Sequence, residues 1–173
     1  YKKEHNGNAP PQDYKNKAWI QWRADKLTDF CGRIHKTVKT IDPNCIVSMS
    51  PSVYPWSKDE YLQDWPEWVK RGFVELICPQ LYRYTIEEYS KILKESFTKY
   101  LPEGYKKIFY PGVLIKVGGY YPEPEFLSQM IEANRELGIE GEVFFFYEGI
   151  KKYKDLMKNS IYREKADFPN LLK

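Results

Sequence analysis

The sequence lacks the patterns that mark several common classes of protein. No apolar run reaches the roughly 18 residues of a membrane span, and no basic segment followed by an apolar one stands at the start. Cys31, Cys45 and Cys78 have none of the paired spacings of a zinc site, and their apolar contexts predict small buried side chains. No Gly-x-Ser-x-Gly, Gly-x-Gly-x-x-Gly or P-loop segment occurs. These absences argue against a transmembrane segment, a Ser-His-Asp hydrolase and a nucleotide-binding sheet, and we expect neither a metal nor another cofactor.

A strong excess of one charge is also missing. Lys plus Arg reach 27 against 24 acidic residues, a net charge of +3, so nothing electrostatic points to nucleic acid or a membrane surface as a partner. Aromatic residues, in contrast, are abundant, with 5 Trp, 15 Tyr and 9 Phe. This content excludes a disordered chain, and 173 residues suffice for one well-buried domain but not for two ordinary ones.

Helical and extended patterns alternate along the chain. Apolar residues at spacings of three and four, from Ile20 to Ile41, predict a long amphipathic helix that begins at Lys17 and ends before Pro43. Further helices are predicted over about 58–71, 86–100, 123–137 and 151–162, and buried strands over 45–51, 74–81, 107–115 and 141–147. Residues 1–15 are predicted to form an irregular lead-in and residues 163–173 a polar tail, which leaves 16–162 for the folded unit.

This alternation predicts an α/β fold made of four consecutive αβ units. Near-continuous apolar strands are typical of parallel sheets that helices cover. An open doubly wound sheet and half of a (β/α)8 barrel both fit the pattern. We favour the half barrel, because no turn carries a nucleotide-binding motif and the strand ends carry side chains suited to polyols. Its two unpaired edge strands predict that the isolated piece is not a stable monomer.

Residues with binding chemistry follow the predicted strands, where parallel α/β folds place their sites. Sugars present hydroxyl edges and apolar C–H faces, so a glycan groove needs fixed hydrogen-bonding groups beside flat aromatic rings. Trp65 and Trp68 lie on a helical stripe and are predicted to be core residues instead. The substrate-binding candidates, including two at the start of the first helix, are Trp22, Arg23, Ser50, Trp56, Gln80, Tyr82, Lys116 and Tyr147.

Glu148 is the candidate catalytic residue. It follows three Phe and a Tyr at the end of the last predicted strand, where partial desolvation would raise the pKa of its carboxyl toward the range of a general acid. A glycosidase needs a second carboxylate, at about 5 to 5.5 Å for retention or about 6.5 to 9.5 Å for inversion. That group would come from a loop, such as Asp59, or from sequence upstream of Tyr1. The alternative for Glu148 is a structural acid at a helix N-terminus.

Several motifs together resemble the glycosyl hydrolase-like 10 family. They are Trp22-Arg23 on the long helix, Ser48-Met-Ser-Pro51 on a strand, Trp68 and Gly72 ahead of Pro79-Gln-Leu-Tyr82, and Gly141-Glu-Val-Phe-Phe-Phe146. The resemblance, over roughly residues 14–150, implies the C-terminal half of a TIM barrel, strands five to eight. It also implies glycan or peptidoglycan substrates and a secreted or cell-envelope location in bacteria. The family's acidic segment would precede Tyr1, and Ala24 and Arg83 replace residues usual in the family.

These observations predict a glycoside hydrolase that uses carboxylates at the C-terminal face of a barrel. Its partner would be a carbohydrate substrate, and upstream sequence would supply the N-terminal half of the barrel. A non-catalytic glycan-binding module with an aromatic groove is the alternative from another class. An open-sheet enzyme of unknown chemistry is the third possibility.

Overall fold

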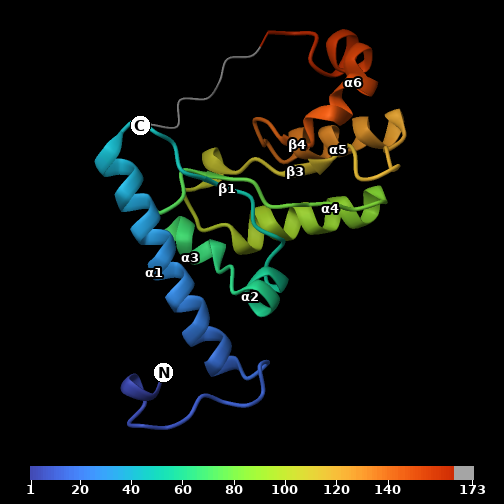
Figure 1. The fold of residues 1–173 in the computed structure, drawn as a ribbon. Coiled ribbons are helices and arrows are strands. Elements are labelled where there is room, and N and C mark those ends of the chain that lie inside the picture. Colours follow the sequence, from blue (N-terminus) through green and yellow to red (C-terminus); the bar gives the residue numbers. More distant parts are fainter. Residues whose placement is uncertain (166–173) are drawn as a thin grey trace.

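A computed structural model describes residues 1–165 and has an α/β arrangement, as the sequence predicts (Figure 1). A long helix comes first, and short parallel strands then alternate with helices. No helix within this range is both long and apolar enough to cross a membrane. The regular elements are α1 (Lys17–Ile41), β1 (Ser48–Met49), α2 (Trp56–Tyr61), α3 (Trp65–Lys70), β2 (Leu76–Ile77), α4 (Ile86–Glu95), β3 (Gly112–Leu114), α5 (Pro124–Glu136), β4 (Val143–Phe145) and α6 (Tyr147–Leu156), with single turns η1 (Lys2–Glu4), η2 (Ser96–Tyr100), η3 (Lys106–Ile108) and η4 (Met157–Ile161).

The four strands lie side by side in the order of the sequence. β1 pairs with β2, and β3 pairs with β4, both in parallel. Parallel bridges from Ile77 to Phe109 and from Gln80 to Gly112 join the two pairs. The Gly112 amide donates to the Pro79 carbonyl at 2.8 Å, and the Leu81 amide donates to the Gly112 carbonyl at 3.1 Å. A doubly wound sheet reverses its strand order at a switch point, and the order β1-β2-β3-β4 has no reversal.

The regular parts of the strands are shorter than predicted, and prolines explain much of the difference. Proline has no N–H to donate to a ladder of backbone hydrogen bonds. Pro51 follows β1, Pro79 follows β2, and Pro111 precedes β3. Each strand therefore continues as extended chain that keeps only part of its pairing. The ends of these extended segments still meet at one edge.

The single helix predicted over 58–71 is wrong, because the chain forms two short helices, α2 and α3. Leu62 ends α2 in the left-handed conformation, with φ of 63°. Pro66 stands in the first turn of α3, where the missing N–H costs no helical hydrogen bond. The break brings Ser57 and Gln63 close to each other, and the Ser57 hydroxyl donates to the Gln63 carbonyl at 3.0 Å.

The hydrophobic core lies between the strands and the helices. Ile77, Leu81, Val113 and Ile115 are fully buried, and they pack among the apolar residues of α3, α4, α5 and α6. Trp65 and Trp68 belong to this core, which confirms the prediction for both. The indole Nε1 of Trp68 also donates to Thr28 Oγ1 of α1 at 2.9 Å, so the long helix is pinned to α3.

The opposite face of the strands differs in composition. Because side chains alternate along a strand, Cys78, Gln80 and Tyr82 point away from the helix-packed core. On β4, Val143 and Phe145 leave 40% and 44% of their surface exposed. This face therefore carries polar groups and incompletely covered apolar side chains.

The cysteines follow the prediction in two of three cases. Cys31 and Cys78 are buried. Cys45 is exposed, and the expectation of burial is wrong for it. The reason is that β1 begins only at Ser48, so Cys45 lies in the connection after α1, where its carbonyl accepts a hydrogen bond from Lys39 Nζ at 2.7 Å.

Candidate functional site

A cavity of about 570 Å³ opens where the chain leaves β1 and β2. The loop after β1, the segment after β2 and helix α4 form its wall. Three of the predicted binding residues come together here, namely Trp56, Gln80 and Tyr82. The complete lining is Ser52, Val53, Tyr54, Pro55, Trp56, Gln80, Tyr82, Arg83, Ile92 and Glu95. We call this space the strand-end cavity.

Neighbouring backbone holds the Gln80 amide in place. Its Nε2 donates to the carbonyl of Ser50 at 2.8 Å, so the end of the first strand holds this half-buried amide. Gly112 lies opposite in the bridge to the third strand, and a Cβ there would stand 3.0 Å from the Pro79 carbonyl oxygen. The second and third strands thus approach closely at Gln80, and a side chain in place of Gly112 would crowd the backbone there. Within residues 1–165, its Oε1 accepts no hydrogen bond, so this acceptor is available to a ligand.

Tyr82 contributes a neutral phenol to the cavity. Burial, together with the nearby Cys78, raises the pKa of Tyr82 to about 12. Burial also raises the pKa of Cys78 to about 11, although a hydrogen bond with Ser50 opposes this rise. Both groups therefore keep their protons at neutral pH. The Tyr82 ring lies 5.4 Å from that of Phe145 on β4, which links the cavity to the open face of the strands.

Trp56 offers the most accessible aromatic surface of the cavity. It is the first residue of α2, and 47% of its surface is exposed. The ring of Tyr61 stands nearly perpendicular to it, at 81° and 4.8 Å between centroids. This edge contact fixes the indole at one end of the short helix. A flat, fixed and exposed ring is the platform that a sugar C–H face requires.

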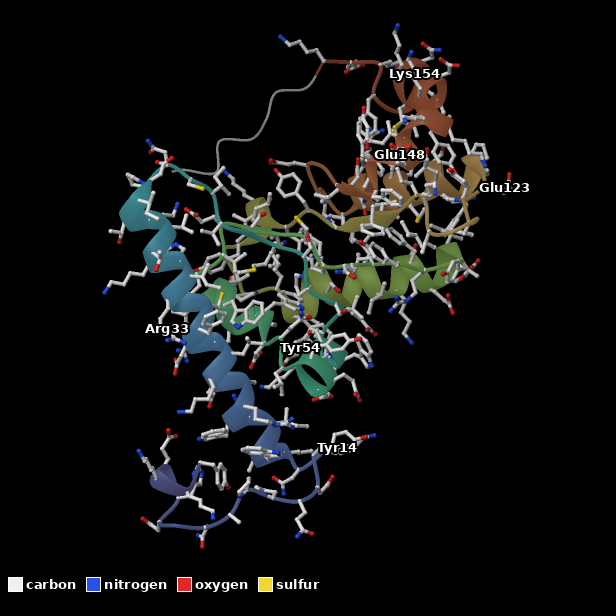
Figure 2. All side chains as sticks on the ribbon, in the orientation of Figure 1. Tyr14, Arg33, Tyr54, Glu123, Glu148 and Lys154 are labelled. Carbon is white, nitrogen blue, oxygen red and sulfur yellow. The ribbon has the colours of Figure 1, made fainter. Side chains whose placement is uncertain are left out.

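The ends of the third and fourth strands carry Lys116, Tyr147 and Glu148, which do not line the strand-end cavity. The Lys116 ammonium lies over the rings of Tyr121 and Phe146, at 5.5 Å and 5.3 Å from their centroids. Tyr147 is 72% exposed. Figure 2 shows Glu148 near β4 and α6, whereas Tyr54 of the cavity lies near α2.

Glu148 is not in the surroundings that the sequence predicts. It lies in the first turn of α6, because this helix begins at Tyr147 and not near Lys151. Its side chain is 51% exposed, and Lys151 Nζ lies 3.0 Å from Oε2. The expected desolvated carboxylate is therefore a solvated helix N-terminal acid in this structure. Asp59, the suggested second carboxylate, is also exposed, in the first turn of α2.

Trp22 and Arg23 lie in a separate aromatic cluster at the start of α1. Trp22 stacks on Trp19, and its Nε1 donates to Glu4 Oε2 at 2.8 Å. Arg23 donates to the Tyr14 carbonyl at 2.7 Å and lies over the Trp19 ring. Hydrogen bonds from Lys26 and Trp22 lower the pKa of the Glu4 carboxyl. These contacts bind the lead-in to α1 and do not bring either predicted residue into the strand-end cavity.

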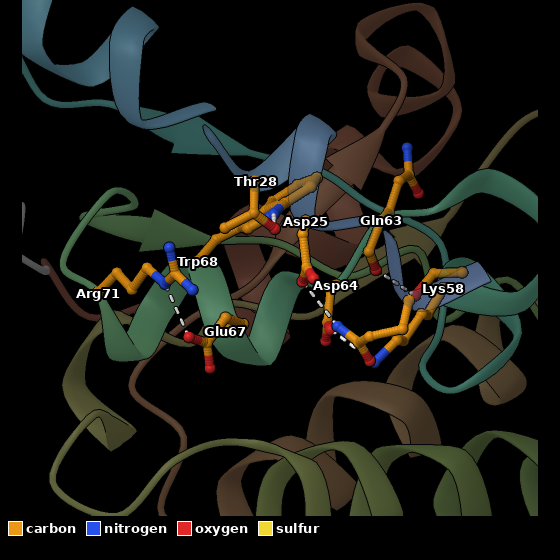
Figure 3. A network of polar contacts seen from close by, with 10 residues as sticks. Asp25, Thr28, Lys58, Gln63, Asp64, Glu67, Trp68 and Arg71 are labelled. Atoms are coloured by element: carbon orange, nitrogen blue, oxygen red, sulfur yellow. Dashed lines mark hydrogen bonds and ion pairs between the residues drawn. The ribbon is translucent and has the colours of Figure 1, made fainter. Parts of the chain in front are cut away.

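A second cavity, of about 480 Å³, was not predicted from the sequence. It lies between α1, α2 and α3, and Tyr54 lines both cavities. Lys58 Nζ contacts Asp64 Oδ2 and Gln21 Oε1, each at 2.7 Å, and Gln21 Nε2 donates to Asp25 Oδ1 at 2.7 Å (Figure 3). Burial pushes the pKa of Lys58 down, but the hydrogen bond and charge of Asp64 outweigh it and leave that pKa raised. We call this space the charged cavity.

A partly buried carboxylate before β4, that of Glu142, was also not predicted from the sequence. The Tyr89 hydroxyl donates to Asn134 Oδ1 at 2.9 Å, and Asn134 Nδ2 donates to Glu142 Oε2 at 3.1 Å. Tyr89 and Asn134 are fully buried. Burial raises the pKa of Glu142, against the effect of the Asn134 hydrogen bond. The chain connects α4, α5 and the start of β4, and it lies away from the strand ends. Sequence spacing gives no sign of it, because its members are 45 and 8 residues apart.

Comparison with known proteins gives one family match. The family model described as glycosyl hydrolase-like 10 matches residues 1–101, which is more than half of the chain. The matched range includes every residue that lines the strand-end cavity, together with Trp22, Arg23 and Ser50. Lys116, Tyr147 and Glu148 lie beyond it. No curated protein matches the chain.

Proposed function

Since the chain belongs to the glycosyl hydrolase-like 10 family, we propose that the protein containing it hydrolyses glycosidic bonds in a polysaccharide or a peptidoglycan-type glycan. One observation carries the proposal. The strand-end cavity gathers an exposed indole, a fixed amide and a neutral phenol, from Trp56, Gln80 and Tyr82. This combination matches the apolar faces and hydroxyl edges of a sugar.

The proposed architecture is the C-terminal half of a (β/α)8 barrel, over residues 16–162. The sequential parallel order of β1 to β4 supports it, because barrel strands follow one another around the axis without reversal. Upstream sequence would then supply the N-terminal half and cover Val143 and Phe145. The lead-in over 1–15 and the tail over 163–173 would flank the unit, and residues 166–173 of that tail lie outside the described range.

Each predicted binding residue has a place in this proposal. Trp56 and Tyr82 would pack against sugar rings, and the free Oε1 of Gln80 would accept from a sugar hydroxyl. Ser50, whose carbonyl holds Gln80, would complete this part of the site. Lys116 and Tyr147 would extend the groove along the later strands, and Trp22 and Arg23 would bind a more distant part of the glycan from their separate cluster at the start of α1. Family membership supports a secreted or cell-envelope location in a bacterium.

The catalytic part of the proposal assigns acid or nucleophile chemistry to Glu148. Its support is position, since it follows β4 at the carboxyl edge where barrel enzymes gather their catalytic groups. The second carboxylate would be Asp59 or a residue of the acidic segment that the family resemblance implies upstream.

The test is cleavage of polysaccharides and of peptidoglycan glycan strands by the full-length protein and its Glu148→Gln variant. We expect the variant to lose roughly 100-fold or more of its activity, as loss of a positioned acid or base does. Glu125→Gln is the matched control, because Glu125 is also an exposed acid in the first turn of a helix. Equal activity of Glu148→Gln and Glu125→Gln would remove Glu148 from catalysis.

A glycan-binding module without catalysis is the second candidate. Two observations favour it: Glu148 is exposed and paired with Lys151, and Glu95 is the one carboxylate among the residues that line the strand-end cavity. A single carboxylate cannot perform the two roles of a glycosidase. Glycan binding by the full-length protein without release of reducing ends would establish this candidate in place of the first.

A further inference from the structure

We propose that Arg83 recognises a carboxylate on the sugar, so that the strand-end cavity takes an acidic glycan in preference to a neutral one. The inference deepens the proposed function and depends on its claim that this cavity binds glycan. Arg83 directly follows Tyr82 and lines the cavity together with Trp56 and Gln80. Its charge therefore stands beside the groups that would hold a sugar ring.

The backbone fixes the guanidinium of Arg83. Its Nη1 donates to the Tyr82 carbonyl at 2.7 Å, in a partly buried position. This hydrogen bond shortens the reach of a long side chain and settles the plane of its planar head group. A guanidinium held in this way loses less rotational freedom when it binds a second group. The remaining N–H donors keep the fork geometry that pairs with both oxygens of a carboxylate.

The charge of Arg83 has no counter-ion in the described part of the chain. No carboxylate there lies within 4.0 Å of its nitrogens, although Glu95 lines the same cavity. Lys58 in the charged cavity gives the contrast, since Asp64 and Gln21 both contact its ammonium. A partly buried cation without a partner costs solvation that a ligand anion can offset. The arrangement points to an anionic group on the ligand.

The aromatic neighbours restrict what carries that anion. Trp56 presents a fixed exposed ring, and Tyr82 presents a phenol that stays neutral and so adds no negative charge beside Arg83. A free inorganic anion would make no use of these rings. A pyranose with a carboxylate uses both the rings and the guanidinium. Hexuronic acids and the ether-linked carboxylate of muramic acid share this chemistry.

The test compares acidic and neutral glycans that differ only in the carboxyl group. The full-length protein is titrated by calorimetry with an oligogalacturonate, with peptide-free glycan strands that contain muramic acid, and with the carboxyl-reduced form of each. We expect an acidic form to bind roughly 10- to 100-fold more tightly than its reduced form, the range of one charge-assisted bidentate contact. This preference should decrease as the salt concentration rises.

Variants assign the preference to Arg83. In Arg83→Gln the ratio of acidic to reduced affinity should fall by the same roughly 10- to 100-fold. Arg83→Lys should keep part of it, because the charge remains and the fork is lost. Arg33→Gln is the control, since Arg33 is exposed on α1, outside the cavity. The control should keep the wild-type ratio.

The outcomes separate the two proposals. Binding of reduced and acidic glycans with equal affinity would overturn the role of Arg83 and leave the proposed function standing. A preference that survives in Arg83→Gln would also overturn it. Binding of neither form would contradict the proposed function itself. A preference confined to one of the two acidic glycans would support the inference and identify the source of the carboxylate.

Discussion

Two cavities meet at Tyr54, and their polar groups are arranged in opposite ways. In the charged cavity, Lys58 contacts Asp64 and Gln21 at 2.7 Å, and Gln21 contacts Asp25. In the strand-end cavity, Gln80 and Arg83 each use one donor on a backbone carbonyl and keep other donors or acceptors free within residues 1–165. The first set of groups is satisfied within the protein, whereas the second is not.

This difference separates a structural network from a candidate binding site. Buried polar groups are stable only with hydrogen-bond partners, and the mostly buried Lys58 and Asp64 side chains partner each other here. The exposed Gln21 and Asp25 of α1 extend this pair at the surface. The network therefore holds α1, α2 and α3 together and leaves little for a ligand to gain. The strand-end cavity leaves fixed polar groups beside the exposed ring of Trp56 and the half-buried ring of Tyr82. Such groups need water or a ligand as the missing partner, which is the property of a binding site.

The largest effect is expected from breaking the saturated network. Asp64→Ala leaves the ammonium of Lys58 without its counter-ion, in a pair whose side chains are only 18% and 10% exposed. We expect the free energy of unfolding to fall by about 2–4 kcal/mol, with glycan affinity unchanged. Urea denaturation of the full-length protein measures this loss. Asp59→Ala, on the exposed side of α2, is the control and should cost less than about 0.5 kcal/mol. A similar loss in both variants would contradict the structural role.

The reverse result is expected for the strand-end cavity. Trp56→Ala removes an aromatic platform that is 47% exposed, so glycan affinity should fall roughly 10-fold while stability changes by less than about 1 kcal/mol. Phe30→Ala removes an aromatic ring of similar exposure, 48%, on α1 and outside the strand-end cavity. It should leave glycan affinity as it is. If Trp56→Ala binds as tightly as Phe30→Ala, the cavity is not the site.

A smaller effect concerns alkaline pH. In the folded protein Tyr82 keeps its proton up to a pKa of about 12, whereas an unfolded tyrosine ionises near about 10. Between these values the folded state binds more protons, so this group's contribution to stability is complete below about pH 10 and is lost as the pH rises through about 12. The difference in unfolding free energy between the wild type and Tyr82→Phe should decrease over this window. A difference that stays constant with pH would show that Tyr82 is not shielded from water.

Local sequence patterns predicted much of the fold. The apolar spacing from Ile20 to Ile41 places α1 correctly at both ends, because a 25-residue amphipathic helix is a strong local signal. The stripe that holds Trp65 and Trp68 correctly marks core residues. The break between α2 and α3 at Leu62 was not predicted, because leucine rarely adopts a positive φ and its immediate neighbours give no sign of one. Pro66 was the available signal, since a proline favours the first turn of a new helix.

The candidate site was predictable to the extent that it follows strand ends. Gln80 and Tyr82 were identified because the carboxyl edge of parallel strands gathers functional groups, and the structure brings both into one cavity with Trp56. The prediction that Glu148 is partly desolvated was wrong. Its exposure depends on where α6 begins, and this helix begins at Tyr147, which puts Glu148 in an exposed first turn. The separate cluster of Trp22 and Arg23 could not be predicted either. It forms through contacts with the lead-in, at Glu4 and Tyr14, which no periodicity reveals.

The most direct test of the central claim is a crystal structure of the full-length protein with a bound oligosaccharide. We predict a sugar ring in the strand-end cavity, packed against Trp56 and Tyr82 and hydrogen-bonded to Oε1 of Gln80. An oligosaccharide bound in the charged cavity, or at any site that leaves these three residues untouched, would contradict the claim.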